Sequence, residues 1–280
     1  MLIRPTWMLP LALAWLIAAL VIGAEEGIVF IRHEYAAERA SLARAIEDAR
    51  RRGALGPDAL GPGRPFDIRV FVSPGGYILG EETALLECLE DSRGEPRNKP
   101  PFPGQKGLHG QPTLINNVET LSYVPLILER GPEAWRALGT RGCVGLKFIS
   151  VSGDVASPGV YQVPMGTTVA ELIAIAGGVP GDRRVLAFAP GGASSNFLPG
   201  SAIDAPLDFQ ALQERGSMLG SGALLVVAEG ADLVDLAANV VAFFRNESCG
   251  KCVPCRVGSE KAVAILTQAA AGRGSQRQLA

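Results

Sequence analysis

The spacing of hydrophobic and polar positions predicts alternating strands and helices in the first part of the chain. The apolar run from Ile28 to Ile31 predicts a strand, and the Ala-, Glu- and Arg-rich stretch from Ala36 to Arg52 predicts a surface helix. A second apolar run at residues 67–73 predicts another strand, which leads into a glycine-rich turn and a further helix. A strand, a glycine turn and a helix in this order are typical of a site that handles a nucleotide.

A different pattern begins beyond a predicted boundary near residues 139–143. Two strand-like segments, KFISVSG and VYQVP, precede a helix-like segment, TTVAELIAIAGG, and two further strand-like segments follow. From Asp232 onward, apolar residues lie on one face of a predicted helix that leads to a cysteine-rich loop. We therefore expect three parts, with bounds 1–140, 141–230 and 231–280, of which the second is a small mixed domain.

Two structures fit the uncharged segment from Trp7 to Ala24. Its hydropathy suits a short membrane span or the apolar centre of a signal peptide behind Arg4. A buried helix is the alternative, and it is favoured because the run barely reaches spanning length, Pro10 interrupts it, and a strand follows. We therefore expect no direct membrane span, and a membrane-anchored protein is a hypothesis that rests on this segment alone.

Composition and charge exclude several classes of function. With 280 residues, of which 48% are hydrophobic and 19% charged, the chain is long enough for two modest globular domains. Its acidic and basic residues are interspersed and leave a net charge of -2, so no basic surface for nucleic acid is expected. His33 and His109 have no nucleophile beside them in the sequence, which leaves hydrolytic catalysis without a recognisable set of residues.

Three of the five cysteines, Cys249, Cys252 and Cys255, are separated by two residues each. Cysteines this close form poor disulfides, but their thiolates can converge on one metal centre, which implies a reducing compartment. The run of three favours a [4Fe–4S] cluster over zinc, because zinc sites usually combine two cysteine pairs separated by a longer stretch. Cys88 is expected in a helix core and Cys143 at a domain boundary, so a fourth cluster ligand is not evident in the chain.

The glycine turn PGGYILG lets the backbone come close to a ligand, although such a turn often serves only to change direction. Glu81 and Glu82 follow the turn at the start of the predicted helix. They could accept hydrogen bonds from a ribose or a nicotinamide amide, or could simply stabilise the helix dipole. Tyr77 could stack on a planar ring or fill the end of the strand.

The segment from Asp91 to Pro112 is dense in Gly, Pro, Lys and Arg and is expected to be an ordered loop. Lys99 lies in the proline-rich part of this loop, and Asn116 and Asn117 follow at the start of another predicted helix. Adjacent asparagines suit the polar edge of an isoalloxazine or a phosphate, although as helix caps they need no ligand.

Three long motifs together resemble the flavin-bearing NADH-binding subunit of respiratory complex I. They are GGYILGEETALLE, EPRNKPPFPGQKGLHGQPTLINNVET and ESCGKCVPCRVGSEKA, in the family's order. The relatives of this family include the diaphorase subunit of NAD-reducing hydrogenases and the beta subunit of NAD-dependent formate dehydrogenases. The segments IRHEY and GGASSNFLPGSAIDAPLDF resemble the formate dehydrogenase branch most.

The resemblance implies an α/β fold with a partial Rossmann-like flavin and NADH domain, a ubiquitin-like beta-grasp domain and a C-terminal helical iron–sulfur segment. It implies FMN, NAD(H) and a [4Fe–4S] cluster as cofactors, with the hydride chemistry supplied by the flavin. By motif position, the residues expected to bind FMN or the dinucleotide are Tyr77, Gly80, Glu81, Glu82, Lys99, Ile115, Asn116, Asn117 and Thr120. Glu81 and Glu82 are expected at the reacting centre, and Cys249, Cys252 and Cys255 are expected to bind the cluster.

The same resemblance implies partners and a location. A thioredoxin-like [2Fe–2S] subunit and a larger iron–sulfur or molybdenum-containing subunit are expected in a cytoplasmic complex that can lie peripherally on the inner membrane. The family's glycine-rich flavin-phosphate loop, its Asn-Ala-Asp-Glu segment and its fourth cluster cysteine have no counterpart, so we expect a chain truncated at both ends that binds flavin weakly by itself. The alternative hypothesis is a non-catalytic fragment that acts only in assembly or metal binding.

Overall fold

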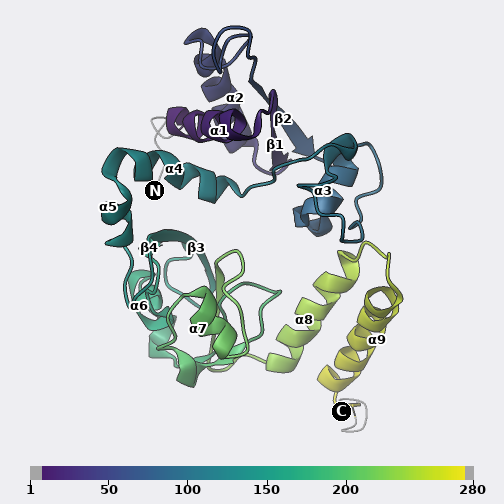
Figure 1. The fold of residues 1–280 in the computed structure, drawn as a ribbon. Helices are drawn as coiled ribbons and strands as arrows, with labels where there is room; N and C mark the ends of the chain where they lie inside the picture. Colours follow the sequence, from purple (N-terminus) through teal and green to yellow (C-terminus); the bar gives the residue numbers. More distant parts are fainter. Residues whose placement is uncertain (1–7, 275–280) are drawn as a thin grey trace. The chain divides into compact units, whose positions relative to one another are not determined.

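The computed structural model describes residues 8–274 (Figure 1). Its contacts divide the chain into two compact units. Among the described residues, the first unit comprises residues 8–129 and 242–261, and the second comprises residues 130–241 and 262–274. The end of the long helix before the cysteine loop, the loop itself and the start of the next helix therefore belong to the first unit. The division into three parts at residues 140 and 230 stays a prediction.

Parallel strands and flanking helices form the beginning of the first unit. Its elements are α1 (Met8–Ile22), β1 (Glu26–Arg32), α2 (Ala36–Arg51), β2 (Asp67–Ser73), the short 3-10 helix η2 (Tyr77–Gly80), α3 (Glu82–Leu89), η3 (Leu108–Gly110) and α4 (Val118–Arg130). β1 and β2 pair in parallel, with Gly27 opposite Ile68, and α1 and α2 pack beside them (Figure 1). The predicted strands, surface helix and glycine turn are therefore confirmed.

A hydrophobic core joins α1, α2 and the two strands of the first unit. Phe66, Ile46 and Ala49 lie in this core, and Trp15 of α1 packs against it. Gly27 has no side chain to obstruct this contact, since a Cβ there would lie 2.5 Å from the Trp15 ring. Any side chain at position 27, even the methyl of alanine, would therefore displace the Trp15 ring from this contact.

Burial of α1 is confirmed for one of its faces only. Ala14 and Ala19 are 2% and 3% exposed, whereas Leu20 and Val21 are 50% and 78% exposed. Part of the apolar run therefore lies at the surface, because a helix can bury only the stripe that faces its neighbours. Within residues 8–274, no helix is long and apolar enough to cross a membrane.

A mixed five-stranded sheet organises the second unit, in the order β4-β3-β7-β5-β6. Its elements are α5 (Pro132–Arg136), β3 (Leu146–Gly153), β4 (Gly159–Pro164), α6 (Val169–Ile175), η4 (Pro180–Asp182), β5 (Val185–Ala189), β6 (Leu198–Pro199), η5 (Gly200–Ala202), α7 (Phe209–Glu214) and β7 (Ala223–Ala228). β3 and β7 are parallel, and the other pairs are antiparallel. Leu172 and Phe188 are fully buried in its core.

The helix α6 begins where the sequence predicts it, because Thr168 and Glu171 form a capping box with reciprocal side-chain to backbone hydrogen bonds. The α/β fold class is confirmed by these two units. The short helix α7 was not predicted; the side chain of Asp208 caps it by accepting from the Ala211 amide.

Two helices with the cysteine loop between them follow the sheet. α8 (Leu233–Asn246) and α9 (Val253–Ala270) contain no fully buried residue. Asp232 starts α8, because its carboxylate accepts hydrogen bonds from the amides of Val234 and Asp235. The predicted helix that delivers the cysteine loop is therefore confirmed.

Candidate cofactor site

The glycine turn after β2 ends in a carboxylate cap. Gly76 has a φ of 100°, which favours glycine, and it leads into η2. Glu81 then caps α3, since its Oε2 accepts from the amides of Thr83 and Ala84, both at 2.9 Å. The Thr83 hydroxyl donates to the same oxygen at 2.5 Å. Glu81 thus uses one carboxylate oxygen for the helix and keeps Oε1 for other partners.

Lys99 bridges the two carboxylates at the start of α3. Its Nζ lies 3.0 Å from Oε1 of Glu81 and 2.5 Å from Oε1 of Glu82. Hydrogen bonds to Glu82 and Glu81 raise the pKa of Lys99. Burial raises the pKa of Glu81, but hydrogen bonds from Thr83, Ala84 and Lys99 outweigh it and leave that pKa lowered. A charged ammonium and a charged carboxylate therefore meet here at neutral pH.

Arg97 binds the loop that contains Lys99 to helix α3. Its guanidinium donates to Glu87 at 2.5 Å and to the Gly107 carbonyl at 3.0 Å, and it lies 2.8 Å from Glu90. The side chain of Arg97 is only 23% exposed. The backbone amide of Arg97 donates to Thr83 Oγ1 at 2.9 Å. The Thr83 hydroxyl therefore binds both the loop and the carboxylate of Glu81.

We expect Arg97→Met to lower the free energy of unfolding by about 1 to 3 kcal/mol, because it leaves two carboxylates and a carbonyl without their donor. The hydrogen bond from Arg97 lowers the pKa of Glu90 from its ordinary value of 4.5. The stability that this pair contributes is complete above pH 4.5 and is lost as the pH falls through the lowered pKa. Urea unfolding between pH 3 and 7 measures both effects; Arg44→Met, at an exposed position of α2, is the matched control. An unfolding free energy equal to that of wild type at pH 7 would contradict the expectation.

Tyr77 lies where the turn meets the end of α8. Its ring makes edge contacts with Phe243 and Phe244, at centroid distances of 5.2 and 6.2 Å, and remains 45% exposed. Its backbone amide donates to Oε2 of Glu247 at 2.7 Å. The structure therefore joins the glycine turn to the helix that precedes the cysteine loop. Gly80, the last residue of η2, directly precedes the Glu81 cap.

The second predicted set, Ile115, Asn116, Asn117 and Thr120, lies on the segment that enters α4. The side chain of Asn117 caps this helix by accepting a hydrogen bond from the Glu119 amide at 2.8 Å. This is the helix-cap role that the sequence offered as the alternative to ligand binding. Asn116, Asn117 and Thr120 are exposed, and Ile115 is half-buried. Their role in flavin binding stays a prediction.

The cysteine loop carries its thiols near the surface. Cys252 and Cys255 are exposed, Cys249 is half-buried, and Ser248 Oγ lies 3.3 Å from the Cys255 sulfur. Within residues 8–274, no three His, Cys, Asp or Glu side chains are gathered closely enough to hold a metal ion. The donor set nevertheless fits an iron–sulfur cluster, because the two thiols of the loop and that of Cys255 in the first turn of α9 lie close together in the sequence and can turn toward a common centre.

The other two thiols are less suited to binding a cluster. Burial raises the pKa of the Cys88 thiol, which packs in a small core with Leu79 and Ala84. Burial, followed by a hydrogen bond to Asp208, also raises the pKa of Cys143, which lies against the core of the second unit. A raised pKa disfavours the thiolate that a metal requires.

Several residues that contact the site were not predicted from the sequence. Arg93 donates to the carbonyl of Cys249 at 2.6 Å, and Lys251 donates to the carbonyl of Pro96 at 2.5 Å. Thr83 and Arg97, described above, complete this group. For Thr83, Arg97 and Lys251 the only available signal was their position inside the motifs, and Arg93, which lies outside them, gave none. The contacts of Arg93 and Lys251 join segments more than 150 residues apart.

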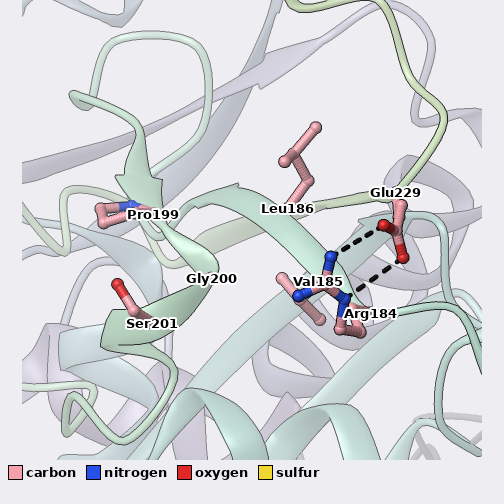
Figure 2. Close-up of a pocket in the computed structure, with 7 residues that line it drawn as sticks. All are labelled: Arg184, Val185, Leu186, Pro199, Gly200, Ser201 and Glu229. Carbon is pink, nitrogen blue, oxygen red and sulfur yellow. Dashed lines mark hydrogen bonds and ion pairs between the residues drawn. The ribbon is translucent and has the colours of Figure 1, made fainter.

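A separate cavity of about 220 Å³ lies in the second unit (Figure 2). It is lined by Arg184, Val185, Leu186, Pro199, Gly200, Ser201 and Glu229. Figure 2 shows Arg184 and Glu229 bonded to each other, and their closest nitrogen–oxygen distance is 2.8 Å. The charges at the cavity thus neutralise each other, and none of the predicted cofactor residues lines it.

Comparison with protein families matches three successive regions of the chain. Residues 11–126 match the Nuo51 FMN-binding domain, residues 148–196 match the SLBB domain, and residues 235–280 match the NADH-ubiquinone oxidoreductase-F iron-sulfur binding region. The chain is similar to the flavin-bearing NADH-binding subunits in all three regions. The resemblance seen in the three motifs is therefore confirmed.

Members of this family from several bacteria are similar over almost the whole chain. An NADH-quinone oxidoreductase subunit of Rhizobium meliloti (strain 1021) is 43% identical, and the alignment covers 94% of this chain and 63% of the relative. The NADP-reducing hydrogenase subunit HndC of Solidesulfovibrio fructosivorans is 38% identical over 95% of this chain and 54% of its own length. The chain thus spans between 54% and 63% of the length of these two relatives.

A solved structure of the family has the same fold. The crystal structure of an NAD+-reducing [NiFe]-hydrogenase in the H2-reduced state superimposes with a TM-score of 0.84 at 34% identity. The match covers 97% of this chain and 45% of that chain.

Proposed function

We propose that this chain is the electron-entry module of an NADH-linked oxidoreductase. In this function a hydride passes between NAD(H) and FMN, and single electrons pass on to a [4Fe–4S] cluster. The observation that carries the proposal is the bridge from Lys99 to Glu81 and Glu82 at the start of α3, within the region that matches the FMN-binding domain. FMN would supply the chemistry, because a flavin accepts a hydride and releases electrons singly.

The residues of the chain would bind and orient the dinucleotide. Because Glu81 is fixed by its cap on α3, its Oε1, which also contacts Lys99, and the carboxylate of Glu82 can accept hydrogen bonds from ribose hydroxyls or a carboxamide. The ammonium of Lys99 can bind a phosphate or a carbonyl oxygen of the same ligand. Tyr77 and Gly80 would border the flavin, and Ile115, Asn116, Asn117 and Thr120 would bind its polar edge. Orientation of the nicotinamide is the main contribution of such a site.

Cys249, Cys252 and Cys255 would hold the cluster, with a fourth ligand from elsewhere. We propose that the chain works with a thioredoxin-like [2Fe–2S] subunit and a larger iron–sulfur or molybdenum-containing subunit. The location would be cytoplasmic or peripheral to the inner membrane, since thiolate ligands need a reducing compartment. Membership in the formate dehydrogenase branch stays a prediction.

Anaerobic reconstitution tests the proposed function. The purified chain is incubated with FMN, iron and sulfide, and absorbance and electron paramagnetic resonance are recorded before and after NADH is added. With FMN in large excess, to offset the weak flavin binding expected of this chain, we expect bound flavin that bleaches with NADH and a signal from a reduced cluster. Absence of both bound flavin and a cluster would favour the alternative, a non-catalytic fragment that acts in assembly or metal binding. Stoichiometric zinc without iron would contradict the cluster.

A further inference from the structure

Residues 93–99 contact the cysteine loop at one end. The guanidinium of Arg93 donates to the carbonyl of Cys249 at 2.6 Å. Lys251 donates to the carbonyl of Pro96 at 2.5 Å, and its Nζ lies 3.4 Å from a carboxylate oxygen of Glu95. Two cations, one on each segment, therefore hold this stretch against the loop that carries the predicted cluster ligands.

The other end of the same stretch contacts the carboxylates of α3. The Arg97 amide donates to the Thr83 hydroxyl, which in turn donates to Glu81. Lys99 reaches both Glu81 and Glu82. Seven consecutive residues thus connect the predicted nucleotide site with the predicted cluster site, and all of these contacts lie within one compact unit.

We propose that residues 93–99 are a coupling strap that transmits occupancy of the nucleotide site to the cysteine loop, with Lys251 as its anchor. Lys251 is the positioning residue because its single ammonium binds a side chain and a carbonyl of the strap at once. A ligand that binds the Lys99 ammonium changes the contacts of Lys99 with the two carboxylates, and the strap carries the change to residues 249–251. Because such coupling is reciprocal, ordering of the cysteine loop changes the free energy of nucleotide binding by the same amount as nucleotide binding changes the free energy of loop ordering.

The identity of the nucleotide in this inference rests on the proposed function. The contact between Lys251 and the strap does not depend on that function. Lys251 and Glu95 keep side-chain exposures of 39% and 33%, so salt screens their attraction. Coupling should therefore weaken only slightly as ionic strength rises. An exposed ion pair by itself contributes little free energy. The hydrogen bond from Lys251 to the Pro96 carbonyl therefore provides most of the interaction between Lys251 and the strap.

Amide hydrogen exchange on the full metal-free chain, with FMN present and with or without NAD+, tests the strap. In the absence of NAD+, Lys251→Met should exchange about tenfold faster at residues 95–99 and 249–252, because one charge-assisted hydrogen bond is lost. In wild type, NAD+ should slow exchange in both segments. In Lys251→Met, NAD+ should slow exchange at residues 95–99 but not at residues 249–252. Lys251→Arg should restore both behaviours, whereas Lys261→Met, at an exposed position of α9, should match wild type.

Two results would overturn the strap. One is exchange in Lys251→Met that equals wild type without nucleotide, and the other is NAD+ protection of residues 249–252 that survives the substitution. Failure of NAD+ to bind wild type would count against the proposed function instead, and the nucleotide-free comparison would still decide whether Lys251 anchors the strap. Circular dichroism of each variant confirms that it is folded.

Discussion

Lys99→Met is expected to weaken NADH binding to the reconstituted protein about 10- to 100-fold, the effect of losing a charge-assisted hydrogen-bond donor. The ammonium lies between Glu81 and Glu82, within 3.0 Å of each. Without it, two carboxylates remain at the start of α3 and repel the phosphates of the dinucleotide. Titration of flavin or nicotinamide fluorescence with NADH measures the affinity, and stopped-flow bleaching of the flavin measures the hydride step.

Lys106→Met is the matched control, because Lys106 is an exposed lysine of the same loop. It should bind NADH as wild type does. An equal loss of affinity in both variants would mean that the general charge of the loop, rather than the bridge at α3, is responsible. Wild-type affinity in Lys99→Met would remove Lys99 from the nucleotide site.

Cys252→Ser is expected to eliminate the [4Fe–4S] cluster while NADH still bleaches the flavin. A serine hydroxyl stays protonated at neutral pH and is a poor ligand for iron, so the loop would keep two of its three thiolates. Iron content and the electron paramagnetic resonance signal of the reduced protein measure the loss. The flavin should still bleach because Cys252 is not among the residues proposed to bind FMN or the dinucleotide.

Cys143→Ser serves as the control for this experiment. Cys143 packs against the core of the second unit, and its substitution should leave the iron content unchanged. Retention of a full cluster signal in Cys252→Ser would show that Cys252 is not a ligand. Loss of the flavin together with the cluster would show that the two sites do not fold independently.

The sequence by itself determined the local elements and the chemistry of the site. Hydrophobic periodicity located β1, α2 and β2, since a segment must bury its apolar side whatever it packs against. The motif at α3 and the three-cysteine spacing indicated a nucleotide and a cluster. These features are local, and short-range rules are sufficient to recognise them.

Only the tertiary structure decided how these parts meet. It showed that Glu81 uses one oxygen as a helix cap and the other for Lys99, which lies 18 residues away. It also brought Lys251 to Pro96 across 155 residues, and left one face of α1 exposed where burial was expected. Such contacts depend on the paths of loops and on which face each helix presents, and periodicity along the chain carries no record of either.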